Sequence, residues 1–109
     1  MAFDEGLAER IRAVLDGRGD IQEKKMFGGL SFLLNGNMAV GVIKDELCVR
    51  VAPERFEAFL RRPGARIFDF TGKPMKGWLM VGADGLAEDS ELAGWIEEGT
   101  AYAESLPPK

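Results

Sequence analysis

The stretch that decides the fold is residues 24–43, which read Lys-Lys-Met-Phe-Gly-Gly-Leu-Ser-Phe-Leu-Leu-Asn-Gly-Asn-Met-Ala-Val-Gly-Val-Ile. Two apolar runs flank Asn35-Gly36. Asn-Gly is typical of a two-residue type I′ turn, because both central residues of that turn must adopt a positive φ. We therefore predict two adjacent antiparallel strands, over residues 30–34 and 38–43.

Gly28-Gly29 lies just before this hairpin and interrupts the strand pattern. Paired glycines in such a place indicate a bulge, a sharp bend or a close backbone approach. We favour a bulge that bends the sheet, in which a β-branched residue at position 29 could not adopt the required positive φ. Asn37 follows the turn and is expected to tolerate substitution.

Working outward, hydrophobic periodicity and turn residues predict the remaining elements. In chain order these are a helix over residues 3–16, a strand over 21–27, a strand over 47–51, a short helix over 54–61, strands over 65–70 and 75–81, and a helix that begins near Ser90 with Asp89 as its N-cap.

Three of these elements carry further signals. The strand over residues 21–27 has a charged middle, which is typical of an edge strand. The strand over residues 47–51 alternates, so that Cys48 and Arg50 share one face. Gly94 and Gly99 each disfavour the last helix by about 1 kcal/mol relative to alanine, so this helix is expected to depend on packing.

The order α-β-β-β-β-α-β-β-α, with tight turns between successive strands, predicts an α+β fold. It has two layers, a mostly antiparallel sheet with helices on one face. The 109 residues correspond to one domain, residues 1–109. No apolar run is long enough to span a bilayer, and the N-terminus does not resemble a signal peptide. With a single cysteine, these features favour a cytoplasmic protein.

The composition excludes several chemistries. The chain has no histidine and one cysteine, so a Ser-His-Asp site, a Cys-His site and a histidine-ligated zinc site cannot be built. We expect no cofactor and no metal. Residues 24–76 hold ten basic and five acidic residues, a net of +5, whereas the whole chain is −4. This basic middle segment keeps nucleic-acid binding open, although the low pI of about 4.9 argues against a dedicated binder.

Lys25-Met26-Phe27-Gly28-Gly29, the Asn35-Gly36 hairpin, Leu47-Cys48-Val49-Arg50-Val51 and Gly72-Lys73-Pro74-Met75 follow one another in this order. Together with the closing helix around Trp95, they resemble the N-terminal domain of the TfoX/Sxy family over nearly the whole chain. The resemblance implies a secretion-chaperone-like α+β fold. In some bacterial members it implies transcription regulation, as a co-regulator of competence genes. Those longer members carry a second, C-terminal domain. The sequence ends where the first domain should end, so a stand-alone domain is expected. The family is not known by a catalytic site.

Candidate interaction residues come from the family-like motif and from the two strands beyond it. They are Met26, Phe27, Gly28, Gly29, Arg50, Lys76 and Trp78. Met26 and Phe27 are either a recognition surface or, as we favour, core packing beneath the first helix. Gly28-Gly29 is either an anion-binding nest or a backbone feature of the sheet.

Arg50, Lys76 and Trp78 either form a polar-aromatic contact site or are ordinary surface residues. Cys48 is either a reactive thiol near Arg50 or a small apolar filler, which we favour.

The sequence favours a small, non-enzymatic interaction domain that acts in gene regulation through a protein partner. Direct nucleic-acid binding is the alternative, and an enzyme ranks third. We also expect a homodimer, because both faces of the predicted hairpin are apolar and the helices cover only one of them. The alternative is that residues 63–75 fold over the second face.

Overall fold

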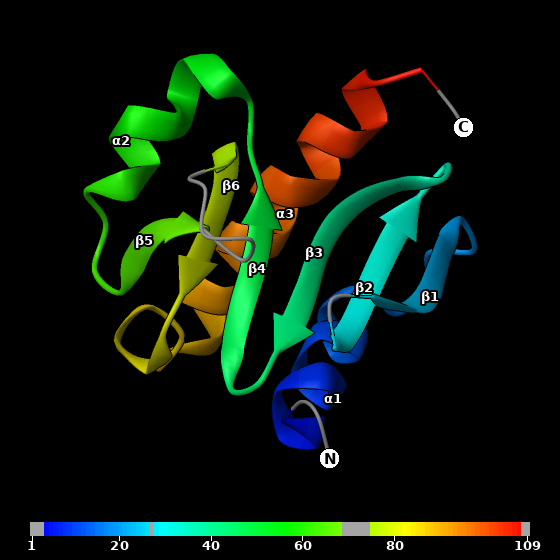
Figure 1. Cartoon of the computed structure of the whole chain (residues 1–109). Coiled ribbons are helices and arrows are strands. Elements are labelled where there is room, and N and C mark those ends of the chain that lie inside the picture. The colour runs from blue at the N-terminus through cyan, green and yellow to red at the C-terminus, as the bar shows by residue number, and fades with distance from the viewer. Residues whose placement is uncertain (1–3, 27, 69–74, 108–109) are drawn as a thin grey trace.

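The computed structural model describes residues 4–26, 28–68 and 75–107. The helices and strands are α1 (Glu5–Val14), β1 (Ile21–Met26), β2 (Gly29–Leu34), β3 (Asn37–Ile43), β4 (Glu46–Arg50), η1 (Pro53–Arg55), α2 (Phe56–Leu60), β5 (Ala65–Phe68), β6 (Met75–Val81), η2 (Ala83–Gly85) and α3 (Asp89–Ser105). The predicted order is confirmed. The strands form one antiparallel sheet in the order β1-β2-β3-β4-β6-β5, and α1 and α3 lie behind it in Figure 1.

The core lies between the helices and one face of the sheet. Side chains of alternate strand residues, such as Val40, Val49 and Leu79, are fully buried there against Ile11 of α1 and Trp95 of α3. Alternation in a strand sends every second side chain to the same face, so this parity matches the apolar periodicity of the sequence. The helices therefore cover one face, as predicted.

The central hairpin has the predicted geometry. Asn35 and Gly36 have φ values of 54° and 83°, and Leu34 pairs directly with Asn37 across this two-residue turn. Both positive φ values are those that a type I′ turn requires. β1 pairs only with β2, which confirms it as an edge strand.

The expected bulge at Gly28-Gly29 is wrong. Gly28, with φ 74°, belongs to the turn between β1 and β2, because Met26 pairs with Gly29. Gly29 has no positive φ, but a Cβ on it would lie 1.9 Å from the Val42 carbonyl oxygen. The register of β2 on β3 shifts instead between Phe32 and Leu33. Gly29 is thus a site of close backbone approach.

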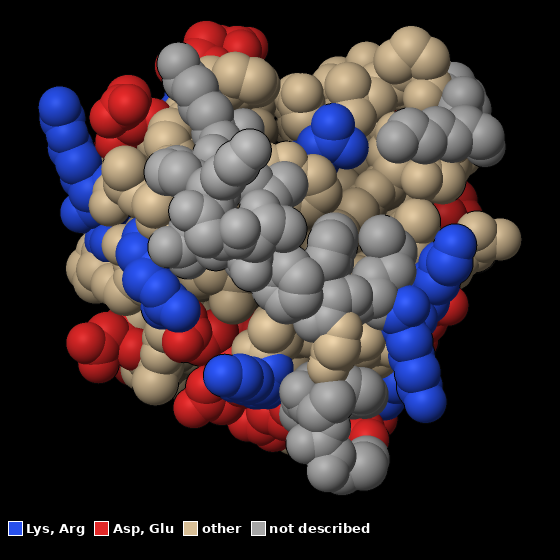
Figure 2. Space-filling view, viewed as in Figure 1, with Lys and Arg blue, Asp and Glu red and all other residues tan. Residues whose placement is uncertain are grey.

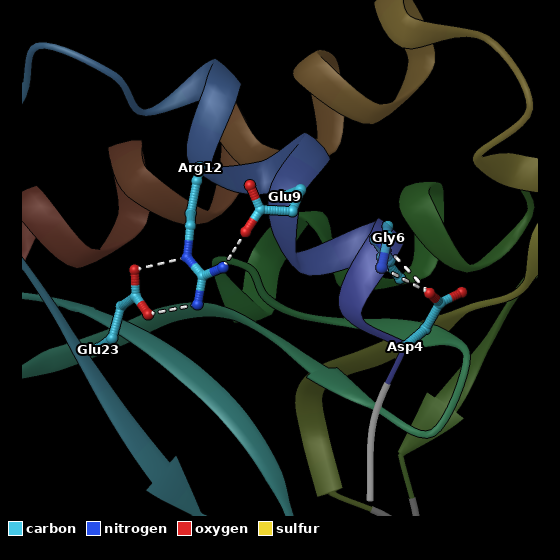
Figure 3. Close-up of polar contacts among 6 residues, drawn as sticks. Asp4, Gly6, Glu9, Arg12 and Glu23 are labelled. Atoms are coloured by element: carbon cyan, nitrogen blue, oxygen red, sulfur yellow. Dashed lines mark hydrogen bonds and ion pairs between the residues drawn. The ribbon is translucent and has the colours of Figure 1, made fainter. Parts of the chain in front are cut away.

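Helix boundaries differ from the prediction by a few residues. Asp4 is the N-cap of α1, and its Oδ1 accepts from the Gly6 N–H at 2.8 Å (Figure 3). The expectation that Asp89 caps α3 is wrong, because Asp89 is its first helical residue. Glu88 holds the N-cap position, and its N–H donates to Glu91 Oε1 at 3.4 Å.

An ion pair fastens α1 to the edge strand. Arg12 of α1 donates from Nε to Glu23 Oε2 on β1 at 2.9 Å and from Nη2 to Glu23 Oε1 at 2.8 Å, and it also contacts Glu9 (Figure 3). The bonds from Arg12 hold the pKa of Glu23 below its usual value. This bidentate geometry positions the charged middle of β1 beside the helix.

The expectation that Asn37 tolerates substitution conflicts with its burial. Its side chain is 1% exposed and its Nδ2 donates to the Pro107 carbonyl at 3.0 Å, which ties β3 to the segment after α3. We predict that Asn37→Ala lowers the free energy of unfolding by about 1 kcal/mol, from urea midpoints. Asn35→Gly is the control and should leave the midpoint unchanged, because glycine readily adopts the positive φ at that position. A wild-type midpoint for Asn37→Ala would show that the Pro107 bond adds no stability.

Over the described residues, the second face of the sheet does not expose the apolar patch that motivated the homodimer. A second cluster lies there, formed by Met38, Cys48, Phe68 and Met80, and none of these is more than 6% exposed. Phe68 comes from residues 63–75, the segment that the sequence offered as an alternative cover, although residues 69–74 lie outside the described ones. Among the residues that the structure describes, Val14 is the one exposed large apolar side chain.

Candidate functional site

Arg50 is the centre of the candidate site. It ends β4 and pairs in register with Trp78 on β6, which places both side chains on the face opposite the core. The Arg50 Cζ lies 5.2 Å from the centroid of the Trp78 ring and 5.3 Å from that of Tyr102 on α3. All three side chains are half-buried. Both distances are within the range of cation–π attraction, so the rings hold the guanidinium in place.

The Arg50 guanidinium has unused hydrogen-bonding capacity. Within the described part of the chain it makes neither a hydrogen bond nor an ion pair, in contrast to Arg55, whose Nη1 donates to Glu98 Oε2 at 2.9 Å. No buried side-chain nitrogen or oxygen among the described residues lacks a partner. The Arg50 nitrogens are therefore open to solvent and available to an acceptor.

Arg50 is one of three arginines that lie over aromatic rings near α3. Arg55 lies over the Phe59 ring at 4.7 Å, and Arg62 lies over the Trp95 ring at 4.8 Å. Phe59 and Trp95 are buried, so Arg55 and Arg62 shield the edge of the core with their side chains. Arg50 differs from them because its two aromatic neighbours are themselves partly exposed.

A hollow of about 270 Å³ adjoins Tyr102. It lies between η1 and the C-terminal half of α3, and its lining residues are Ala52, Glu54, Arg55, Glu98, Ala101, Tyr102 and Ser105. A larger hollow of about 410 Å³ lies near the start of α1, but two of its three charged side chains, Asp4 and Arg10, already have partners. Asp4 caps α1, and Arg10 donates to the Leu86 carbonyl at 2.8 Å and to Asp89 at 3.1 Å.

The structure brings together only part of the predicted site. Arg50 and Trp78 are in contact. Gly29 lies at the opposite ends of the strands, because its neighbour Leu30 pairs with Val42, which in turn pairs with Leu47 near the start of β4. The side chains of Met26 and Lys76, and the whole of Phe27, lie outside the described residues. No following helix accompanies Gly28-Gly29, so the turn lacks the context of a phosphate loop.

Sequence reasoning missed Tyr102 as a member of this site. Tyr102 follows Trp95 by seven residues, so both side chains lie along one side of α3. The spacing could have shown that Tyr102 shares a face of the helix with Trp95. It could not show which residue Tyr102 contacts, because that depends on where α3 crosses the sheet. Only the tertiary structure shows that Arg50 reaches it.

Cys48 is the buried filler that we favoured. It is 0% exposed, and burial raises the pKa of its thiol to about 12. We predict that iodoacetamide leaves folded protein unlabelled at neutral pH and labels Cys48 fully in urea, as measured by intact mass. Rapid labelling of the folded protein would restore the alternative of a reactive thiol.

The cations of the basic middle segment that the structure describes do not form one patch. Lys24 and Lys25 lie on the edge strand β1, whereas Arg61 and Arg66 lie near the opposite edge, which β5 forms. Figure 2 shows blue side chains at opposite margins of the face opposite α1 and α3, with red ones among them. Arg66 is also paired with Glu46. This scatter gives a polyanion no continuous basic surface over the described residues.

The described residues contain neither a candidate metal site nor a candidate membrane span. The described residues hold no group of three or more Cys, Asp or Glu side chains placed to bind a metal ion. Over the same residues, no helix has the length and apolar character needed to cross a membrane.

The fold and the site define a class of protein, a small α+β domain with an open antiparallel sheet and a half-buried arginine held by aromatic rings. A family model described as the TfoX N-terminal domain matches residues 13–103, and the chain belongs to that family. This confirms the resemblance drawn from the motifs. The comparison with curated proteins finds no match.

Proposed function

We propose that this domain is a non-enzymatic interaction module that regulates transcription through a protein partner. Membership of the TfoX N-terminal domain family supports this reading. The observation that carries it is the half-exposed cluster of Arg50, Trp78 and Tyr102. Arginine, tryptophan and tyrosine are the residue types that contribute most to binding energy at protein interfaces.

Features of the chain also favour binding over catalysis. The chain has no histidine, and its single thiol is buried. The hollow beside Tyr102 contains two carboxylates, but Glu98 is already bound to Arg55. A general acid–base pair requires groups that can reach a substrate and exchange protons with it.

Site-specific photo-crosslinking in the source cells tests this function. A crosslinking residue at Ala101, exposed and adjacent to Tyr102, should capture one protein, and Arg50→Ala should abolish that adduct. The same crosslinking residue in place of Ala13, which is exposed on α1, is the matched control and should not capture that protein. Identical adducts at both positions, or an adduct that survives Arg50→Ala, would exclude this surface.

The regulatory role needs a separate readout. Transcript levels in cells carrying Arg50→Ala should match those of a deletion strain, while Arg61→Ala should match wild type. The nucleic-acid alternative predicts submicromolar binding of labelled duplex by the purified domain, with a steep dependence on salt.

The homodimer is a further proposal. Sedimentation across a range of protein concentrations tests it, and a mass that stays at the monomer value of 11.9 kDa would exclude the dimer.

A further inference from the structure

We infer that Arg50 is the receptor for one side-chain carboxylate in a peptide segment of the protein partner. The inference rests on the proposed function and adds the chemistry of the partner. It starts from a contrast among the three arginines near α3. Arg55 has a carboxylate from its own chain, whereas Arg50 and Arg62 have none among the described residues. Of these two, Arg62 lies over a buried ring and Arg50 lies over rings that are partly exposed.

The surroundings of Arg50 prepare it for a bidentate contact. A guanidinium is planar, and its N–H donors lie in that plane, where they match the two oxygens of a carboxylate. Arg50 lies near the rings of Trp78 and Tyr102 and makes no hydrogen bond within the described residues, so these donors remain free. Because the rings already restrict the side chain, binding an acceptor loses less conformational entropy than it would for a mobile surface arginine.

The charges around Arg50 favour one carboxylate over a phosphate chain. Glu54 and Glu98 line the hollow beside Tyr102, and Arg55 neutralises Glu98. Glu104, two residues after Tyr102, is paired with Arg18 at 2.6 Å. Glu54 makes no ion pair within the described residues, so a polyanion placed across this surface would meet uncompensated negative charge. A single carboxylate matches the single positive charge of Arg50, which makes no ion pair within the described residues.

The shape beside the cation fits a peptide. The hollow of about 270 Å³ adjoins Tyr102, and Ala52 and Ala101 give it apolar wall. A chain that places its carboxylate on Arg50 can lay the neighbouring residue in this hollow and contact the exposed parts of Trp78 and Tyr102. Aromatic and arginine anchors beside a small pocket are the usual composition of such an interface.

An NMR titration of the whole chain tests the inference at the atoms concerned. The probe is a short alanine-rich peptide with one central glutamate and blocked ends, and the signals are the Arg50 Nε–H and the Trp78 indole N–H. Both should shift together, and the matched glutamine–alanine peptide should cause no shift. Arg50→Lys keeps the charge but loses the forked pair of N–H donors, so the affinity should fall about tenfold. Arg61→Gln, an exposed cation of the neighbouring helix end, should bind as wild type does.

Several outcomes would overturn the inference. These are no shift at millimolar peptide, equal binding of the glutamine peptide, and undiminished binding by Arg50→Lys with a wild-type spectrum elsewhere. Tighter binding of oligothymidine through Arg50 would make the acceptor a phosphate and support the nucleic-acid alternative. If the peptide fails while the Ala101 adduct still requires Arg50, the carboxylate chemistry is wrong and the proposed function stands. If the adduct is also absent, the proposed function fails.

Discussion

Gly29→Val is expected to lower the free energy of unfolding by about 3 kcal/mol, at the upper end of the usual cost of overpacking. A Cβ at position 29 would lie 1.9 Å from the Val42 carbonyl oxygen and 3.0 Å from its carbonyl carbon. Both atoms belong to the backbone of β3, which is paired with β2 and β4 and cannot turn aside as a side chain would. The first residues of β2 must separate from β3, and ladder hydrogen bonds are lost.

Urea unfolding followed by tryptophan fluorescence measures this effect. Gly19→Val is the matched control, because Gly19 has no atom within 4 Å of an added Cβ and no positive φ. Its midpoint should stay close to that of wild type. Equal midpoints for the two valine variants would mean that the backbones of β2 and β3 do not approach closely at Gly29. The destabilisation comes from this steric contact. It does not come from a positive φ, which the paired-glycine pattern predicts at position 29 and which Gly29 does not have.

Gly94→Ala and Gly99→Ala are expected to change stability in opposite directions, although both glycines lie in α3. Position 94 has open space around an added Cβ, so alanine should raise the free energy of unfolding by about 0.5–1 kcal/mol through helix propensity. Position 99 lies against β3, where an added Cβ would be 2.5 Å from the Ala39 carbonyl oxygen and 2.8 Å from Val40 Cγ1. The overpacking there costs about 1–3 kcal/mol.

Thermal unfolding of the two variants gives a direct comparison, since each kcal/mol corresponds to about 4–8 °C in a domain of this size. The helix-propensity gain is the same at both positions, so the difference between the two melting temperatures isolates the contact with β3. Gly99→Ser adds a side chain of similar size with lower helix propensity and should melt below Gly99→Ala. Stabilisation by Gly99→Ala would show that α3 can move away from the sheet at no cost.

The predicted sites show where sequence reasoning succeeds and where it stops. Alternation placed Cys48 and Arg50 on one face of their strand, and the structure places Cys48 in the second cluster on that face. The sequence grouped Arg50 with Trp78, which are 28 residues apart and meet because β4 pairs with β6. Nothing in local periodicity specifies that pairing, since β5 lies between them in the chain and outside them in the sheet.

Local signals by themselves determined the element order, the type I′ turn at Asn35-Gly36 and the α+β class, because turn φ values and side-chain parity depend on neighbouring residues only. The tertiary structure alone decided which glycines matter, how deeply Asn37 is buried and which ring joins Arg50 from α3. These features arise where segments far apart in the chain come within a few ångströms. Such approaches depend on the packing of the whole domain, which no short window of sequence encodes.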